Sequence, residues 1–406
     1  MTEHVVESFS GCVHALKQSG LRQSLYDAAA IMMDRVLVNL HGEEHRKRRN
    51  QEAIVFRKDI FLHYEKNVLP KTLEETIAPM IEAGRGDLVD IGYRVMMNLT
   101  VDFTGIDRPE RSAQETEDLL ALLRAFSLAP ALGQSLTDDA EEKKAIIKQA
   151  MADFDARYLT PSLERRRDAK AAVDAGKMDK DDLPKDVLMM LVLGQDDLGM
   201  TELDLLKEGI FYTLAGAHTT IHSLGHAIHE LFEWLDAHPE DKARLKDDPF
   251  FIQQCMFESL RLHPSSPVAK RRASCPVSLE ADQDVEEGEE VVVNLWSANR
   301  NTEIFGEDAD RFNPHRTIPK GYFPYGLSMG YGMHACLGRN LAVGVVPKAG
   351  ADPEDHQYGT VPLIVEALLR FGVQRDPEGT PRKDETITRT TWAQYPVVFK
   401  PEEALV

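Results

Sequence analysis

The stretch Met329-Gly330-Tyr331-Gly332-Met333-His334-Ala335-Cys336-Leu337-Gly338-Arg339-Asn340-Leu341-Ala342 decides how the rest of this chain is interpreted. Three glycines, Gly330, Gly332 and Gly338, surround one cysteine, and glycine permits positive φ angles and close backbone approach. We therefore expect residues 329–338, the cysteine loop, to form a tight loop that holds the Cys336 side chain against a flat partner. An apolar, helix-like run follows the loop.

The single cysteine limits which kind of metal site the loop could form. The thiolate is the metal-binding form of cysteine, and a zinc site needs several Cys or His ligands together. A single cysteine suits an axial ligand of haem iron better. The alternative from the residues alone is a glycine-rich turn around a buried structural cysteine.

Composition excludes several classes of protein. The 406 residues carry a formal net charge of −20, which argues against binding nucleic acid or an anionic membrane surface. The four cysteines show no CxxC spacing, as is usual in a reducing cytoplasm. No basic, apolar leader is visible at the N-terminus, and no run approaches the roughly 20 apolar residues of a membrane helix. We expect a cytoplasmic protein without membrane or nucleic-acid partners.

A long helix is predicted before the cysteine loop. Thr201-Glu202-Leu203-Asp204 has the form of a capping box, and helical character persists to about Leu235, roughly 50 Å at 1.5 Å per residue. Its middle reads Leu214-Ala215-Gly216-Ala217-His218-Thr219-Thr220. Small residues there leave room for a flat group, and a mid-helix threonine can bond back to a carbonyl and open a groove.

The spacing G-x-G-x-H-x-C-x-G resembles the haem-binding loop of the cytochromes P-450, the haem-thiolate monooxygenases; Met329 stands where that family usually has phenylalanine. The resemblance runs from about residue 40 to the C-terminus. It implies a mainly α fold with a small β region, a single haem domain over residues 1–406, and heme b (iron protoporphyrin IX) as cofactor. Cys336 is then the axial iron ligand, with the cofactor also contacted by His334, Gly330, Gly332 and Gly338.

The helix motif resembles the family's oxygen-binding sequence, alanine/glycine-Gly-x-acid-Thr-Thr. The resemblance implies that Thr219 and His218 are catalytic, that Ala215 lies against the cofactor, and that Leu214 and Ala215 face the substrate. His218 occupies the place of the usual acid. Histidine can also relay protons, since its ordinary pKa is about 6.5.

Further residues match positions that hold the cofactor in this family. His45 and Arg49 lie one helical turn apart and match the residues that contact the haem propionates, as does Arg271 in the segment 268–273. Val268 would then face the substrate. Without the resemblance, a basic helix such as residues 45–49 is most often a solvated face.

A charge cluster is implied behind the haem loop. Glu258 and Arg261 stand three residues apart, and Arg316 resembles the third member of the cluster. The spacing alone is weak, because surface ion pairs of this kind are common. In this chain the pair lies between the long helix and the cysteine loop, in the order and at the distance that the family shows, and the resemblance therefore supports the interpretation as a charge cluster.

The histidines of the long helix allow another interpretation. His222, His226 and His229 follow His218 at helical spacing, which could suit zinc. A row along one helix cannot surround a metal without other ligands. Packed histidines against neighbouring helices are the favoured interpretation.

Strands and irregular segments complete the expected organisation. The one strand-rich region predicted comprises 268–273, 277–279 and 288–295. An insertion with two prolines and two glycines, at about residues 346–360, interrupts the helix after the cysteine loop. The part before His45 is shorter than usual for the family, so some of the first helix and edge strands are expected to be missing.

The resemblance implies a monooxygenase that inserts one oxygen atom from O₂ into an apolar small-molecule substrate. No glycine-rich dinucleotide loop or iron–sulfur cysteine cluster occurs in the sequence, so NAD(P)H-derived electrons are expected from a separate ferredoxin and ferredoxin reductase. His218 prompts one alternative, a peroxide-driven or non-oxygenating haem-thiolate enzyme. A haem-binding ligand sensor without turnover is the alternative from another class.

Overall fold

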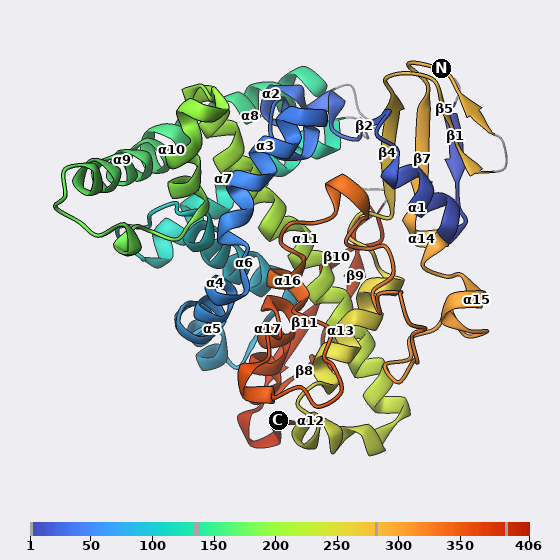
Figure 1. Ribbon diagram of the computed structural model, residues 1–406. Helices are drawn as coiled ribbons and strands as arrows, with labels where there is room; N and C mark the ends of the chain where they lie inside the picture. Colours follow the sequence, from blue (N-terminus) through green and yellow to red (C-terminus); the bar gives the residue numbers. More distant parts are fainter. Residues whose placement is uncertain (1–2, 133–138, 281–282, 386–388) are drawn as a thin grey trace. The chain divides into compact units, whose positions relative to one another are not determined.

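The computed structural model describes residues 3–132, 139–280, 283–385 and 389–406 (Figure 1). The chain packs as two compact units, the first formed by Met1–Arg22, Phe61–Gly92 and Thr219–Val406 and the second by Gln23–Ile60 and Tyr93–His218. Helices dominate both units, so the expected mainly α fold with a small β region is confirmed. Among the described residues, none of the helices is long and apolar enough to cross a membrane.

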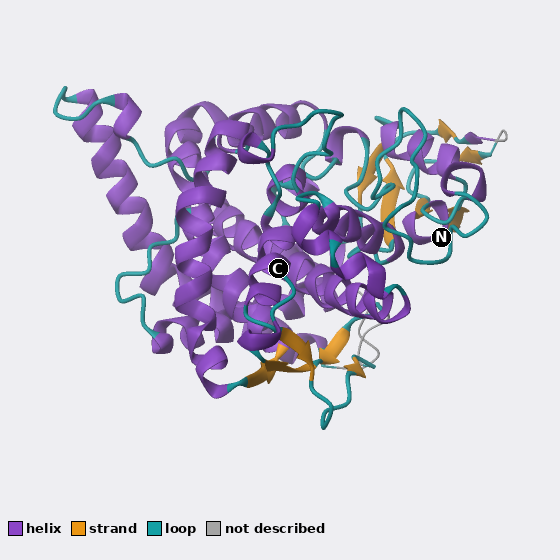
Figure 2. Ribbon diagram, turned by 90° about the horizontal axis from the view of Figure 1, so that it is seen from below, coloured by secondary structure: helices purple, strands orange, loops and turns teal. Residues whose placement is uncertain are grey.

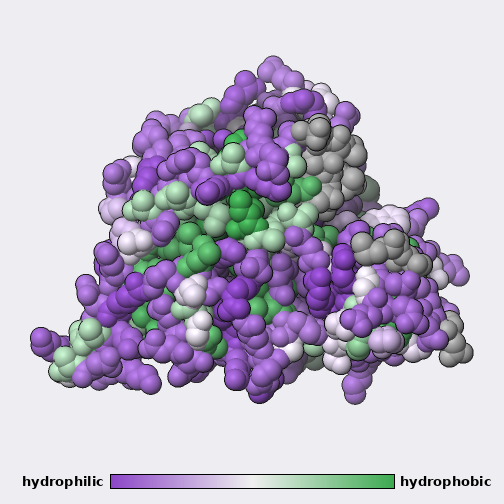
Figure 3. All heavy atoms as spheres, turned by 90° about the horizontal axis from the view of Figure 1, so that it is seen from above, coloured by the Kyte–Doolittle hydropathy of each residue, from purple (hydrophilic) through white to green (hydrophobic). Residues whose placement is uncertain are grey.

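The second unit is built almost entirely from helices. Its helices are α2 (Ala30–Met33), α3 (Gly42–Glu52), α7 (Ala113–Ala131), α8 (Ala140–Phe154), α9 (Thr160–Asp174) and α10 (Val187–Leu198). Three helices have residues in both units: α4 (Lys58–His63), α6 (Leu88–Thr104) and α11 (Glu202–Ala237). Hydrophilic residues cover most of the face seen in Figure 3, as expected from the net charge of −20.

The long helix predicted from the sequence is α11. Its start is a reciprocal cap, in which the Asp204 N–H donates to Thr201 Oγ1 at 3.1 Å and the Thr201 N–H donates to Asp204 Oδ2 at 2.8 Å. The helix ends at Ala237, two residues before Pro239. The predicted bounds were therefore correct to within two residues.

The first unit contains the remaining helices and most of the strands. Its helices are α1 (Phe9–Lys17), α5 (Leu69–Ala83), α12 (Arg244–Asp247), α13 (Phe251–Leu262), α14 (Leu295–Ala298), α15 (Thr302–Phe305), α16 (Arg339–Val343) and α17 (Thr360–Arg370). The strands are β1 (Glu3–Val6), β2 (Leu21–Gln23), β3 (Arg85–Asp87), β4 (Val268–Ala273), β5 (Val277–Ser278), β6 (Asp284–Val285), β7 (Glu290–Asn294), β8 (Val373–Arg375), β9 (Arg382–Lys383), β10 (Trp392–Gln394) and β11 (Pro396–Phe399). Figure 2 shows the strands in two separate groups.

The larger sheet has the order β1-β7-β4-β2. β4 pairs antiparallel with β7, so that Arg271 faces Val291, and β1 pairs parallel with β7. The three predicted strand segments appear as β4, β5 and β7. The N-terminal segment supplies both edge strands and α1, which packs on the sheet through Cys12 and Leu16. The expectation that some of the family's first helix and edge strands are missing stays a prediction.

A second sheet, β3-β11-β8, was missed by the sequence analysis. Its strands have only three or four residues and bring Gly86 opposite Val397. Strands this short carry too few alternations to give a period-two signal, and β3 is separated from its partner β11 by hundreds of residues of chain. The prediction of a single strand-rich region was accordingly wrong.

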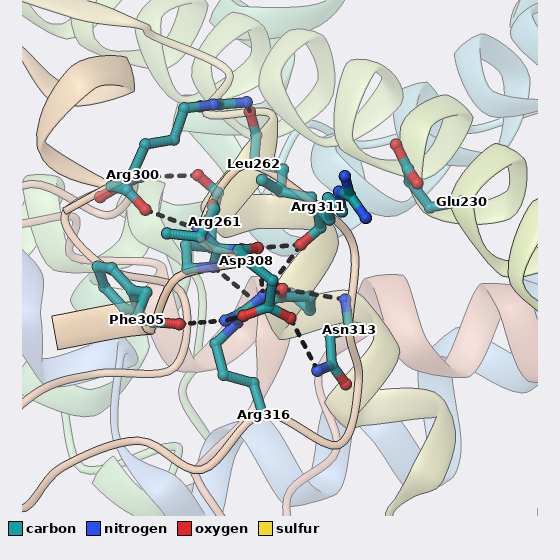
Figure 4. Close-up of polar contacts among 12 residues, drawn as sticks. Glu230, Arg261, Leu262, Arg300, Phe305, Asp308, Arg311, Asn313 and Arg316 are labelled. Atoms are coloured by element: carbon teal, nitrogen blue, oxygen red, sulfur yellow. Dashed lines mark hydrogen bonds and ion pairs between the residues drawn. The ribbon is translucent and has the colours of Figure 1, made fainter. Parts of the chain in front are cut away.

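A buried charge cluster forms the scaffold at the end of α13 (Figure 4). Arg261 is 0% exposed and Glu258 3% exposed. The Arg261 guanidinium donates to both carboxylate oxygens of Glu258, at 2.7 and 2.8 Å, and to the carbonyls of Asn299, Ala309 and Arg311. All five N–H donors of an arginine are thereby used. Arg316 Nε adds a third cationic contact, 3.0 Å from Glu258 Oε1.

All of the last four carbonyls of α13 accept hydrogen bonds, the first from the regular i, i+4 donor and the other three from side chains outside the helix. The Ser259 carbonyl accepts from the backbone N–H of His263 at 2.8 Å. Those of Leu260, Arg261 and Leu262 accept from Ser328 Oγ, Asn299 Nδ2 and Arg300 Nη2, at 2.7, 3.0 and 2.8 Å. A helix C-terminus needs such donors, because its final carbonyls have no partners within the helix. This end of α13 is thus a fixed point in the first unit.

The predicted interruption after the cysteine loop is confirmed. α16 ends at Val343 and α17 begins at Thr360, with a loop over residues 344–359. The loop is anchored at its base. The Glu65 carboxylate accepts the backbone N–H groups of Tyr358 and Gly359, at 3.2 and 2.8 Å, and Gln253 Nε2 donates to the carbonyls of Val343 and Tyr358, both at 2.9 Å.

We predict that Glu65 makes the stability of this region depend on pH. Burial raises the pKa of the Glu65 carboxyl to about 7, and the two N–H donors only partly oppose that effect. The folded state then holds the proton more tightly than the unfolded state. The free energy of unfolding should fall by roughly 3 kcal/mol as the pH rises from about 4.5 to about 7, and should not change further through Glu65 above that range.

Unfolding by urea across this pH range tests the effect. Glu65→Gln should flatten the pH profile, whereas Glu74→Gln, an exposed acid on α5, should leave it unchanged. Identical slopes for Glu65→Gln and the unmodified protein would contradict the prediction.

A second prediction concerns the burial of the charge cluster. Arg261→Met should destabilise the protein by about 3–5 kcal/mol, because it leaves a buried carboxylate with one fewer partner. Arg46→Met is the matched control: Arg46 pairs with Glu43 at the same i, i+3 spacing, but the two side chains are 65% and 58% exposed. That change should leave the urea midpoint almost unchanged, because an exposed pair gains little from its contact. Equal urea midpoints for the two variants would show that burial does not set the value of the pair.

Candidate haem-binding site

The cysteine loop is a closed turn whose shape depends on two glycines. Gly330 and Gly332 have φ angles of 68° and 69°, in the region that favours glycine. The Cys336 N–H donates to the Met329 carbonyl at 2.8 Å, which brings the two ends of the loop together. The Cys336 side chain is exposed. Gly338 differs from the expectation of a positive φ: its φ is −81°, and it is the residue before α16.

The inner side of the loop packs on the end of α13. Met329 contacts an apolar cluster of Phe257, Leu260, Tyr325 and Val343. The methionine in place of phenylalanine therefore fills the core behind the loop. An unbranched thioether adapts readily to such a gap.

Two polar residues that sequence reasoning missed attach the loop to α13. Asn299 is 0% exposed. Its Nδ2 donates to the Arg261 carbonyl and its Oδ1 accepts the Leu327 N–H at 2.7 Å. Ser328 Oγ donates to the Leu260 carbonyl. A single asparagine or serine in an irregular segment gives no sequence signal of burial, so only the fold could reveal them.

The N-terminal helix α1 lies against the outer turn of the loop. A Cβ atom on Gly332 would come within 2.5 Å of the Leu16 carbonyl oxygen, so only glycine fits there. Lys17 Nζ lies 5.1 Å from the centre of the Tyr331 ring, a cation–π distance. The segment expected to be incomplete therefore supports the cysteine loop.

The donor set of the loop fits haem iron. Cys336 offers one accessible sulfur on a loop held by glycine turns and by α13, which is what an axial thiolate requires. In the part of the chain that the structure describes, no group of three or more His, Cys, Asp or Glu side chains could hold a metal ion. His334 lies in the same loop, on a short 3₁₀ turn over Gly332–His334.

The middle of α11 has an unusual set of contacts at Thr219. Ser223 Oγ, one turn later, and Ser265 Oγ, in the loop before β4, each lie 3.0 Å from the Thr219 carbonyl oxygen. The two hydroxyls lie 2.9 Å from each other. Neither serine was singled out from the sequence.

The later histidines of α11 take part in packing. His226 is 3% exposed, stacks on His263 with ring centres 4.2 Å apart, and has Nε2 2.7 Å from the Thr390 carbonyl. His229 Nδ1 lies 3.2 Å from the Tyr395 hydroxyl. Burial lowers the pKa of His226 to about 2, so its ring is neutral.

In the second unit, α3 carries His45 and Arg49 one turn apart. His45 is 3% exposed. Burial, followed by the charges of Arg49 and His41, lowers the pKa of His45 to about 4. Its neighbour Arg48 is paired with Glu208 of α11, with Nη1 2.9 Å from Oε2.

The N-terminal half of α11 carries Leu214, Ala215 and His218. Gly216 there was expected to leave room for a flat group. Its hydrogen side faces α6 instead, since a Cβ would lie 2.8 Å from Thr100 Cγ2. That glycine serves a close approach of two helices. In the first unit, Val268 and Arg271 lie on β4, and Arg271 is 4% exposed.

Comparison with known proteins shows the family to which this chain belongs. The family model described as cytochrome P450 matches residues 90–344. A biotin biosynthesis cytochrome P450 of Bacillus subtilis (strain 168) is 30% identical over 158 residues, 39% of this chain and 37% of that protein. The aligned stretches span about a third of the length of the first curated relatives.

Solved structures extend the likeness to almost the whole chain. The crystal structure of CalO2 has a TM-score of 0.73 at 19% identity, covering 98% of this chain and 90% of that one. The structure of P450BioI in complex with an acyl carrier protein ligated to hexadec-9Z-enoic acid gives 0.73 at 18% identity, covering 98% and 92%. At these identities the likeness concerns the fold. Together with the family match, which spans more than half of the residues and ends just beyond the cysteine loop, it shows that the chain belongs to the cytochrome P450 family.

Proposed function

We propose that this protein is a haem-thiolate monooxygenase that inserts one oxygen atom from O₂ into an apolar small-molecule substrate. The observation that carries the proposal is the accessible Cys336 sulfur on a loop closed by Gly330 and Gly332, in a chain of the cytochrome P450 family. Bound heme b would supply oxygen activation and transfer. The protein supplies the thiolate, the protons and the site that orients the substrate.

Two arginines and two histidines would bind the cofactor carboxylates. Arg49 and Arg271 would supply positive charge, and His45 and His334 would donate N–H groups. The low pKa of His45 means that its ring is neutral before an anion is bound. A propionate beside it would oppose the effects of burial and of Arg49, so His45 can gain a proton as the cofactor binds.

The middle of α11 would handle protons and substrate. Thr219 would hold a proton donor at the activated oxygen, and His218 would take the place of the acid that usually feeds it. Leu214, Ala215 and Val268 would line the substrate space. Their apolar side chains favour an apolar ligand.

Electrons would come from a separate ferredoxin and its reductase, with NAD(P)H as their source. The support is the sequence, which has no glycine-rich dinucleotide loop and no cysteine cluster for an iron–sulfur centre. We also propose a cytoplasmic location. The support is that the four cysteines, all within the described residues, are not joined in disulfides, as expected in a reducing compartment.

One observation favours a second candidate. His218 in place of a carboxylic acid would suit an enzyme driven by peroxide. Hydrogen peroxide already contains the protons that a proton relay must otherwise supply to O₂. Turnover with NAD(P)H, ferredoxin and reductase supports the monooxygenase, and turnover on peroxide alone supports the second candidate. Ligand-dependent spectra without either turnover would identify a sensor and overturn both.

We predict that Cys336→Ala abolishes thiolate ligation. The reduced, CO-bound variant should lose the Soret band at the position expected of a thiolate ligand, and it should lose oxygenase activity. Cys275→Ala removes the other exposed cysteine and should leave both unchanged. Retention of the band in Cys336→Ala would contradict the assignment.

A further prediction concerns His218. His218→Asp should raise the amount of product formed per NAD(P)H consumed, because a carboxylic acid suits the proton relay better. A positioned general acid is worth roughly 100-fold in rate, so a partial gain is measurable. His218→Asn introduces a side chain of nearly the same shape as aspartate but without a titrating group, so it should not raise the product formed per NAD(P)H. Equal coupling in the Asp and Asn variants would argue against a relay at this position.

A further inference from the structure

We propose that Ser265 and Ser223 are positioning residues for oxygen activation. Their hydroxyls clasp the carbonyl of Thr219 and fix the turn of α11 from which the Thr219 side chain projects. The inference rests on the proposed function, because it assigns these serines to the threonine of that same reaction. Neither serine would touch the reacting atoms.

We call the contacts among the Ser223 hydroxyl, the Ser265 hydroxyl and the Thr219 carbonyl the clasp. It joins two segments that are distant in sequence. Ser223 follows Thr219 by one helical turn, and Ser265 comes from the loop between α13 and β4. Each hydroxyl lies 3.0 Å from the Thr219 carbonyl oxygen, and the hydroxyls lie 2.9 Å apart. All three distances are those of good hydrogen bonds.

The two serine hydroxyl protons are enough to keep the Thr219 carbonyl hydrogen-bonded. A carbonyl can only accept, and each serine hydroxyl donates one proton, so two protons serve three contacts. If Ser223 donates to the carbonyl, Ser265 can donate to Ser223; the reverse arrangement is equally available. In each of these arrangements, the Thr219 carbonyl receives at least one hydroxyl proton.

A hydroxyl bound to a carbonyl in mid-helix affects the local helix geometry. Side chains that bond back to the carbonyl four residues earlier bend helices, and so do groups inserted from outside. Here both occur at one carbonyl. The turn that carries Thr219 is therefore set by the loop containing Ser265 as well as by the helix itself.

The loop that carries Ser265 is itself firmly held. Arg389 Nη1 donates to the Ser265 carbonyl at 3.1 Å, and the Trp296 N–H donates to the Pro267 carbonyl at 3.0 Å. Ser265 stands three residues after Leu262, the last residue of α13. That end also holds the cysteine loop through Asn299 and Ser328. The α13 C-terminus is thus a common reference for the thiolate loop and for the turn of Thr219.

The test compares Ser265→Ala and Ser223→Ala with a control on the same helix. Thr213→Val removes a similar back-bond, from Thr213 Oγ1 to the Gly209 carbonyl at 2.9 Å, that lacks a second hydroxyl. Ser265→Thr and Ser223→Thr keep the hydroxyl and serve as rescue variants. All are studied as the haem-loaded protein.

Two readouts report on the Thr219 turn without a known substrate. The first is the infrared C–O stretch of the reduced protein with bound CO, which senses polar groups near the ligand. The second is hydrogen peroxide released per NAD(P)H consumed, with redox partners and O₂ but no added substrate. A clasp that merely stabilises the fold would move the unfolding midpoint and leave the CO stretch unchanged.

We expect Ser265→Ala and Ser223→Ala to shift or broaden the C–O band and to change peroxide release several-fold. The double variant should add little to the larger single effect, because the hydroxyls act as one unit. At least one threonine variant should restore the original band, and Thr213→Val should match the unmodified protein. An unchanged band in both alanine variants, or an equal shift in Thr213→Val, would overturn the proposal.

The CO spectrum of the unmodified protein separates this proposal from the proposed function. If that protein shows no thiolate-type Soret band, the proposed function fails. If the band is present in every variant and only the clasp readouts are silent, the positioning role alone fails.

Discussion

The structure depends most on the full positive charge of Arg261, held where water does not reach it. Such a charge is costly unless every donor is used and a counter-charge lies close. Glu258 supplies the counter-charge, and three backbone carbonyls from residues 299–311 complete the set. The requirement for five acceptors brings the segment 299–311, which is irregular on both sides of α15, against α13.

The end of α13 also positions segments of the proposed catalytic site. The carbonyls that end α13 bind Ser328 and Asn299 next to the cysteine loop, and the loop that leaves α13 carries Ser265 to the middle of α11. The end of α13 therefore helps to fix the position of Cys336 and that of Thr219. This gives the E-x-x-R spacing a physical meaning: the arginine keeps the end of α13 in one position.

The sequence predicted what repeats or has a strong local pattern. The long helix with its capping box, the strands β4 and β7 and the interruption after the cysteine loop were all found from periodicity, capping and glycine or proline content. The family fold followed from motif spacing. What escaped prediction depends on distant partners: the sheet of β3, β8 and β11, the bracing of Gly332 by Leu16, and isolated polar residues such as Asn299. Whether a lone serine is solvated or grips a carbonyl depends on the fold, and its local sequence does not reveal it.

The loop over residues 344–359 has a consequence for how this chain can vary. Its two ends are joined by the Val345 N–H bond to the Gln357 carbonyl at 3.0 Å, and Glu65 and Gln253 hold the same base. With the ends fixed, the length between them matters little, since doubling a flexible loop costs only about 0.6 kcal/mol. The tip near Gly350, which is exposed and where an added Cβ would meet nothing within 4 Å, is thus a position at which new sequence can be accommodated while the cysteine loop keeps its support.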